Sequence, residues 1–169
     1  MLRMLTIGLT LLLAAPVMAQ PGPEEYQSRD GHFTIQFPGK PKESTQSAKT
    51  QAGVLKVHTA TFATREGNVY LVSHTEFPAT MTRPENHDSL FKGVRTGLIG
   101  KDGKLVSEKE VMVAGTKGRE VLVDKSKQQT RFRVVVKDTR LYQMAAVGTG
   151  PFVTGDEVTA FFDSFEFTK

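Results

Sequence analysis

The chain has 169 residues, of which 38% are hydrophobic and 24% charged, with a formal net charge of +4 and no cysteine. One ordinary domain is expected, and collagen-like, low-complexity and wholly disordered classes are excluded because branched and aromatic residues recur throughout. The absence of cysteine excludes disulfides, thiol catalysis, thiolate metal sites and a lipid-modified cysteine. Basic residues alternate with acids, as in Glu108-Lys109-Glu110, which favours a mixed-charge surface over nucleic-acid binding.

The first 19 residues have the pattern of a secretory signal peptide. Arg3 supplies a positive charge, residues 5–15 form an apolar run, and small residues up to Ala19 end it. The alternative is a membrane anchor, but a span needs about 20 apolar residues, and polar residues begin at Gln20. We therefore expect cleavage after Ala19 and a soluble protein in the periplasm or outside the cell, with no stable membrane anchor.

Residues 20–30 are expected to form a flexible segment, because they are polar and rich in proline and glutamate, and because their apolar residues recur at no regular spacing. The globular domain is therefore expected to span residues 31–169. It opens with His32–Phe37, where apolar and polar residues alternate as in a half-buried strand before Pro38 to Pro41 stop the pattern.

The next segments combine a predicted loop and a predicted hairpin. Lys42–Ala52 carries almost nothing to bury and predicts a mobile surface loop. Two β-rich runs, Val54–Thr64 and Val69–Phe77, then flank the turn residues Arg65–Asn68. This arrangement predicts a β-hairpin.

A change to a helical period predicts a helix over Arg83–Ile99. Thr82 and Glu85 have capping-box spacing at its start. The apolar residues that follow recur at helical spacing: Leu90, Phe91, Val94 and Leu98. Gly100 supplies the stop signal.

Four further extended runs are separated by short breaks: Leu105–Val113, Gly118–Lys125, Arg131–Lys137 and Leu141–Gly148. Such breaks predict antiparallel neighbours, since parallel strands need a crossover of about a dozen residues or more. A second capping-box pattern at Thr154–Glu157 predicts a short C-terminal helix carrying Phe161 and Phe162, with Phe165–Phe167 ending as a strand.

These elements predict an α+β domain: a single antiparallel β-sheet of six to seven strands packed with two helices. An antiparallel sheet needs one face covered, and the apolar side chains of both helices are expected to cover it. The aromatic residues on these helices are therefore interpreted as core.

Several segments carry a resemblance to a known family: Phe33–Gly39, Gly118–Val123 leading into Arg131–Val136, Arg140–Met144 and Phe161–Phe167. In these segments and in the order of its elements, the chain resembles the PsbP-like family of extrinsic photosystem proteins, together with the DcrB-like envelope proteins and nuclear Ran-binding relatives of the same fold. The resemblance covers about residues 31–167. It implies a PsbP-like sandwich, an antiparallel sheet between helices, and binding or assembly support without chemistry. It carries over no functional residue.

No catalytic motif is recognisable, and no catalytic residue or cofactor is predicted. None of the eight serines lies in a Gly-x-Ser-x-Gly elbow. No Asp-x-Asp-x-Asp-Gly calcium loop is present. The glycines between residues 97 and 103 close a helix, whereas those of a phosphate loop follow a strand and open one.

The four histidines include no pair at metalloprotease spacing. His58 and His74 lie on the two arms of the predicted hairpin. A loop of two or four residues would place them on opposite faces of the sheet, where they could not share a metal, whereas a three-residue loop or a bulge reverses this parity. No metal site is predicted, and metal binding through His58 or His74 stays an alternative. His87 is interpreted as packed or capping, and His32 as a surface residue.

Six basic residues gather around the predicted meander and define a candidate partner-binding basic edge: Lys125, Lys127, Arg131, Arg133, Lys137 and Arg140. Arg131 and Arg133 are two apart, so both are expected on the face opposite that of Phe132. The favoured interpretation is a solvated face or edge protection by charge. The functional alternative is attraction to an envelope protein or an anionic polymer.

Together these features predict an exported, soluble, non-catalytic binding or assembly-support module of the cell envelope. The alternative is a hydrolase or a small-ligand-binding protein whose site cannot be recognised from sequence. No nucleic-acid partner is expected.

Overall fold

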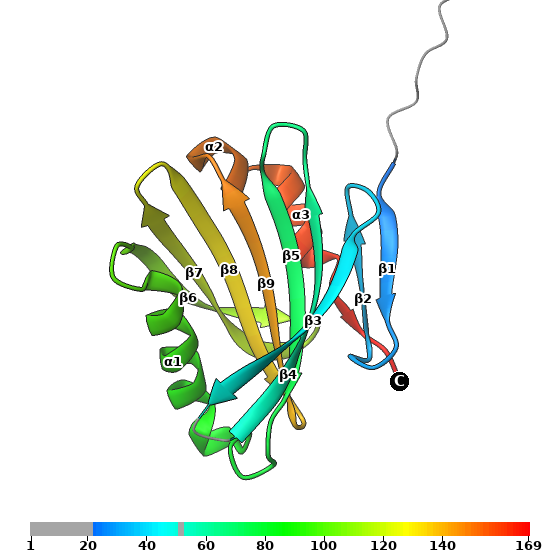
Figure 1. The fold of residues 1–169 in the computed structure, drawn as a ribbon, viewed down its shortest axis with the longest axis vertical. Helices are drawn as coiled ribbons and strands as arrows, with labels where there is room; N and C mark the ends of the chain where they lie inside the picture. Colours follow the sequence, from blue (N-terminus) through cyan, green and yellow to red (C-terminus); the bar gives the residue numbers. More distant parts are fainter. Residues whose placement is uncertain (1–21, 51–52) are drawn as a thin grey trace, which may run out of the picture.

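The computed structural model describes residues 22–50 and 53–169, so the predicted signal peptide lies outside the described residues. The main layer is a seven-stranded antiparallel sheet in the order β3-β4-β5-β9-β8-β7-β6 (Figure 1). Its strands are β3 (Lys42–Thr50), β4 (Gly53–Ala63), β5 (Val69–Glu76), β6 (Lys104–Val113), β7 (Thr116–Lys125), β8 (Gln128–Lys137) and β9 (Arg140–Gly148). The predicted hairpin and four-stranded meander are confirmed.

A second sheet of three strands, in the order β1-β2-β10, packs against the main sheet (Figure 1). Its strands are β1 (Glu24–Ser28), β2 (Phe33–Phe37) and β10 (Glu166–Phe167). The prediction of a single sheet is therefore wrong. β2 pairs with β1 and β10 rather than with the hairpin, and its apolar side chains pack face to face against the main sheet.

β1 corrects the prediction that residues 20–30 are a flexible segment, of which residues 20 and 21 lie outside the described residues. All five residues of this strand pair antiparallel with β2. The ring of Tyr26 lies 6.1 Å from that of Phe33 and 6.0 Å from that of Phe37. Hydrogen bonds to β2 and this aromatic contact hold the segment in place, although its polar composition gives no sign of a strand. The domain therefore begins before residue 31.

β3 corrects the prediction of a mobile loop over Lys42–Ala52, whose last two residues lie outside the described residues. The strand pairs along its whole length with β4. It forms an edge of the main sheet and exposes nearly every side chain. Backbone hydrogen bonds hold it without any hydrophobic pattern, and polar side chains are a usual protection of an edge strand.

The helix predicted over Arg83–Ile99 is confirmed in its main part. It consists of a 3-10 turn, η1 (Pro84–Asn86), followed by α1 (His87–Ile99). The capping box does not form, since neither helix has a side-chain cap. The hydroxyl of Thr82 donates instead to the carbonyl of Ala79.

The predicted C-terminal helix is confirmed as α3 (Asp156–Asp163), and a short helix that was not predicted, α2 (Gly150–Val153), precedes it. The helices do not cover one face together. α1 lies on one face of the main sheet, whereas α3 and the small sheet lie on the other (Figure 1).

Two clusters of buried apolar side chains fill these layers. Phe161 and Phe162 of α3 belong to the larger cluster, between the main sheet and the small sheet. Phe91 of α1 belongs to the smaller one, where it joins Phe132 and Val134 of β8. The predicted core roles of these helix residues are confirmed. Within residues 22–50 and 53–169, no helix is long and apolar enough to cross a membrane.

Candidate functional site

The six basic residues singled out in the sequence do not form one edge. β8 lies between β7 and β9, inside the main sheet. Lys125 precedes the turn before β8 and Lys127 lies in it, whereas Lys137 and Arg140 flank the turn after β8. Since a strand advances about 3.3 Å per residue, the length of β8 keeps these two turns far apart. The prediction that the six residues share one edge of the meander is therefore wrong, and partner binding by them stays a prediction.

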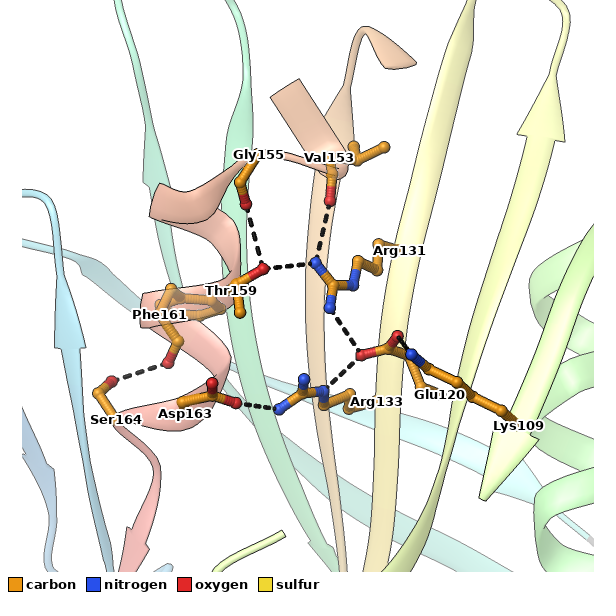
Figure 2. A network of polar contacts seen from close by, with 10 residues as sticks. All are labelled: Lys109, Glu120, Arg131, Arg133, Val153, Gly155, Thr159, Phe161, Asp163 and Ser164. Carbon is orange, nitrogen blue, oxygen red and sulfur yellow. Dashed lines mark hydrogen bonds and ion pairs between the residues drawn. The ribbon is translucent and has the colours of Figure 1, made fainter. Parts of the chain in front are cut away.

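Arg131 and Arg133 lie opposite Phe132, as expected, but on the face that α3 covers. Their side chains are 13% and 10% exposed, and both reach the carboxylate of Glu120 on β7 (Figure 2). Arg133 Nε donates to Glu120 Oε2 over 2.6 Å, and Arg131 Nη2 donates to the same oxygen over 3.1 Å. Burial alone would raise the pKa of Glu120, but the hydrogen bonds from these two guanidinium groups outweigh it and lower the pKa.

The same two arginines fasten α3 to the main sheet. Arg133 Nη1 donates to Asp163 Oδ1 over 2.7 Å, and Arg131 Nη1 donates to Thr159 Oγ1 over 2.9 Å (Figure 2). Both guanidinium groups also lie over the ring of Phe162, at 5.0 and 5.3 Å from its centroid. Because both side chains are largely buried and donate to groups inside the protein, they do not form a solvated patch.

A polar cavity of about 480 Å³ lies where the small sheet meets β3, β4 and β5. We call it the histidine cleft. It is lined by Tyr26, Gln27, Ser28, Arg29, Asp30, Glu43, Ser44, Thr45, His58, Thr59 and His74. Most of these residues come from the two segments that the sequence predicted to be flexible.

His58 on β4 and His74 on β5 are direct cross-strand partners. The preference for opposite faces is therefore wrong. Ala63 pairs with Val69, so the hairpin loop has five residues, and an odd loop brings two even-numbered positions to the same face. The two imidazole rings stack with centroids 4.8 Å apart and planes 9° apart.

The two rings differ in their surroundings. His58 Nδ1 lies 3.0 Å from the hydroxyl of Thr45. His74 is 7% exposed, and the edge of Phe33 packs against it. Burial, followed by the positive charges of His58 and Arg140, lowers the pKa of His74 to about 4. The His74 imidazole is therefore neutral at pH 7.

The turn between β1 and β2 forms the wall over His74. A Cβ atom at Gly31 would lie 2.6 Å from Phe33 Cε1, 2.7 Å from Ser28 Oγ and 2.8 Å from His74 Nδ1. The Gly31 amide donates to Ser28 Oγ, and its carbonyl accepts from the hydroxyl of Tyr142 over 2.9 Å. Only glycine fits this approach of the backbone to the histidine.

A second hollow of about 260 Å³ borders the same pair. It shares Asp30, His58 and His74 with the histidine cleft and adds three charged residues, Lys56, Glu76 and Arg140. The histidine pair is thus flanked by two cavities of mixed charge.

The remaining histidines have local roles. His87 Nε2 lies 2.9 Å from the carbonyl oxygen of Thr82, which agrees with a packed or capping residue. His32 does not begin a strand but occupies a turn position with φ of 53°. No cluster of three or more His, Cys, Asp or Glu side chains suited to a metal occurs in the described ranges.

Comparison with known proteins identifies the fold. No family model and no curated protein matches the sequence. The solution structure of cyanobacterial PsbP (CyanoP) from Synechocystis sp. PCC 6803 is similar over 92% of this chain and 98% of that chain, with a TM-score of 0.53 and 14% sequence identity. The chain has the PsbP-like fold. A Pseudomonas aeruginosa protein of unknown function is similar over 81% of this chain and 90% of that chain, with 9% identity and a TM-score of 0.43.

In this PsbP-like domain, the cleft brings together groups suited to binding. The Thr45 hydroxyl contacts His58, but no hydrogen bond joins that ring to a carboxylate among the described residues. Ser28 Oγ is occupied by the Gly31 amide. An activated hydroxyl needs a base that is itself oriented by a third group, and the contact between Thr45 and His58 has no such group within residues 22–50 and 53–169. Polar groups that converge on a cavity of this size are typical of a ligand site.

Proposed function

We propose that this chain is an exported, non-catalytic binding module of the cell envelope, and that the histidine cleft is its binding site. The observation that carries the proposal is the cleft itself, a polar cavity of about 480 Å³ at the junction of two sheets. Its volume lies in the range of about 300 to 1,000 Å³ that is usual for ligand sites, and its lining is more polar than that of most such sites.

Export is supported by the sequence of residues 1–19, with its early positive charge, apolar run and small residues before Gln20. Expression in a bacterial host, followed by fractionation and N-terminal sequencing, tests this part. The expected result is an extracytoplasmic product that begins at Gln20. A cytoplasmic product that begins at Met1 would contradict it.

A polar segment of an envelope protein is the partner that the cleft favours. Its walls carry Asp30 and Glu43 beside Arg29, so neither charge sign dominates. Attraction to an anionic polymer would need a concentrated positive patch, and two of the six basic residues that suggested one are paired with Glu120.

Site-specific photo-crosslinking in envelope extracts tests this choice. A photoreactive residue at Glu43 samples the cleft, one at Ser47 samples the same exposed strand outside it, and one at Lys127 samples the basic turn. We expect one discrete adduct from position 43 and none from position 47. An adduct from position 127 alone would move the interaction to the basic turn, and equal labelling from all three would overturn specific binding.

A small polar ligand is the second candidate, because the volume of the cleft suits one. NMR titration with a library of small polar compounds separates the two. Amide shifts confined to residues 26–31 and 43–45 at low ligand concentration would favour the small ligand over the protein segment.

A further inference from the structure

The histidine pair has the arrangement of a bidentate ligand set. His58 and His74 are directly opposite each other on adjacent antiparallel strands, where Cβ atoms are about 4.5 to 5.5 Å apart. The pair borders two cavities, of about 480 and 260 Å³. Both rings can therefore be reached from solvent.

His74 has unused hydrogen-bonding capacity. Its side chain contacts Phe33 and the ring of His58, and no hydrogen bond reaches its ring nitrogens within the part of the chain that the structure describes. Buried polar side chains normally have a partner. No described side-chain nitrogen is sealed from solvent without one. The Nδ1 atom of His74 faces Gly31, so Nε2 is the nitrogen left for a ligand.

Only one of the two ring nitrogens of His58 has a hydrogen-bond partner among the described residues. Thr45 contacts its Nδ1 atom, which leaves Nε2 as the free nitrogen of that ring. A hydrogen bond to one ring nitrogen of a histidine commonly fixes the orientation in which the other binds a metal.

We propose that His58 and His74 together bind one divalent transition-metal cation, with Cu²⁺ the preferred ion and water completing its coordination. Imidazole nitrogen is a favoured ligand of copper, nickel and zinc, and copper binds such nitrogen sites most tightly of the three. This inference rests on the proposed function, because the metal would occupy the cleft where the partner binds.

Ring rotation is the one rearrangement that binding requires. Two nitrogen ligands each lie about 2.0 to 2.1 Å from a bound ion, so the stacked rings must turn their nitrogens toward a common point. Because Gly31 and Phe33 pack against His74, the rotation falls mainly on the ring of His58. Asp30 and Glu76 border the pair and favour a cation, whereas Lys56 and Arg140 oppose it.

Copper titration of the exported chain tests the inference by calorimetry and electron paramagnetic resonance. The wild-type chain is expected to bind one Cu²⁺ with coupling to two imidazole nitrogens. His58→Gln should weaken binding by roughly tenfold or more, because the chelate becomes a single ligand, and should leave coupling to one nitrogen. His87→Gln is the matched control and should bind copper as the wild type does.

His74→Gln provides an independent variant, with circular dichroism to show that it is folded. The same loss of affinity is expected. Copper binding that is unchanged in His58→Gln, or a wild-type spectrum with a single imidazole nitrogen, would overturn the inference.

The metal site and the proposed function can fail separately. If the metal site fails, crosslinking from Glu43 in metal-free extract would still support the proposed function. Copper binding without crosslinking would support the metal site and contradict the protein partner.

Discussion

Arg133 and Glu120 meet at 2.6 Å beneath α3, where both side chains are almost fully buried. Arg131 and Lys109 complete the neutralisation of the carboxylate, at 3.1 Å each. The desolvation of both charges offsets most of the attraction in a buried ion pair, so the pair adds little net stability. Removing one partner nevertheless destabilises the fold strongly, because the other charge is left buried and unpaired. This cluster joins β6, β7, β8 and α3 around one carboxylate.

Removing that carboxylate is expected to destabilise the fold strongly. Glu120→Ala leaves two buried guanidinium groups without their shared acceptor and should lower the free energy of unfolding by about 3 to 5 kcal/mol. Glu110→Ala is the matched control, because Glu110 is half exposed and 3.4 Å from Lys117, where pairs contribute about 0 to 1 kcal/mol. Urea unfolding measures both. Equal losses in the two variants would contradict a structural role for the buried cluster.

Gly31 and Gly93 should respond to alanine with opposite signs. A Cβ at Gly31 would collide with Phe33, Ser28 and His74, and overpacking of this kind costs about 1 to 3 kcal/mol. A Cβ at Gly93 meets nothing within 4 Å, so Gly93→Ala inside α1 should stabilise by roughly 0.5 to 1 kcal/mol. Thermal unfolding of the two variants is the measurement. A stabilised Gly31→Ala would mean that the turn over His74 is not closely packed.

The stability of the metal-free protein should fall as the pH falls from about 6.5 to about 4. The pKa of His74 is about 4 in the folded state, against an ordinary value of 6.5. In this window the unfolded chain binds a proton that the folded chain does not, so acid favours unfolding. Protonation linked to His74 should lower the free energy of unfolding by at most roughly 3 kcal/mol over this pH range.

Urea unfolding at a series of pH values, with a chelator present, tests the role of His74. His74→Gln should flatten the slope between pH 6.5 and 4, because the titrating group is removed. Met112→Ala removes an exposed side chain that does not titrate and should keep the wild-type slope. If His74→Gln retains the full dependence, another group is responsible for the acid sensitivity.

The elements predicted correctly are those that bury an apolar pattern. The hairpin, the meander and the main part of α1 all carry side chains at a period of two or 3.6 residues, and burial selects that period. β1 and β3 were not predicted as strands, because they pair through backbone hydrogen bonds and bury few side chains. A polar edge strand such as Lys42–Thr50 buries too little to leave a signal in its sequence.

The candidate site escaped prediction for a related reason. Its position depends on the five-residue loop between Ala63 and Val69, and a change of one residue in loop length moves His58 to the other face. Arg131 and Arg133 were expected on the correct face, but their burial depends on α3 packing over that face of the sheet. The sequence carries no local signal for either long-range arrangement.

Phe91 tests whether α1 is an integral part of the fold. It is the one buried residue of this helix, and it packs in the cluster with Phe132, Val134 and Val136 of β8. Phe91→Ala should cost about 3 to 5 kcal/mol, as truncation of a buried phenylalanine usually does, and unfolding should stay a single transition. Met112→Ala is the control, since Met112 is 59% exposed and should change stability by no more than about 0.5 kcal/mol. An early loss of helical signal, with the main transition unmoved, would show that α1 packs on the sheet without supporting it.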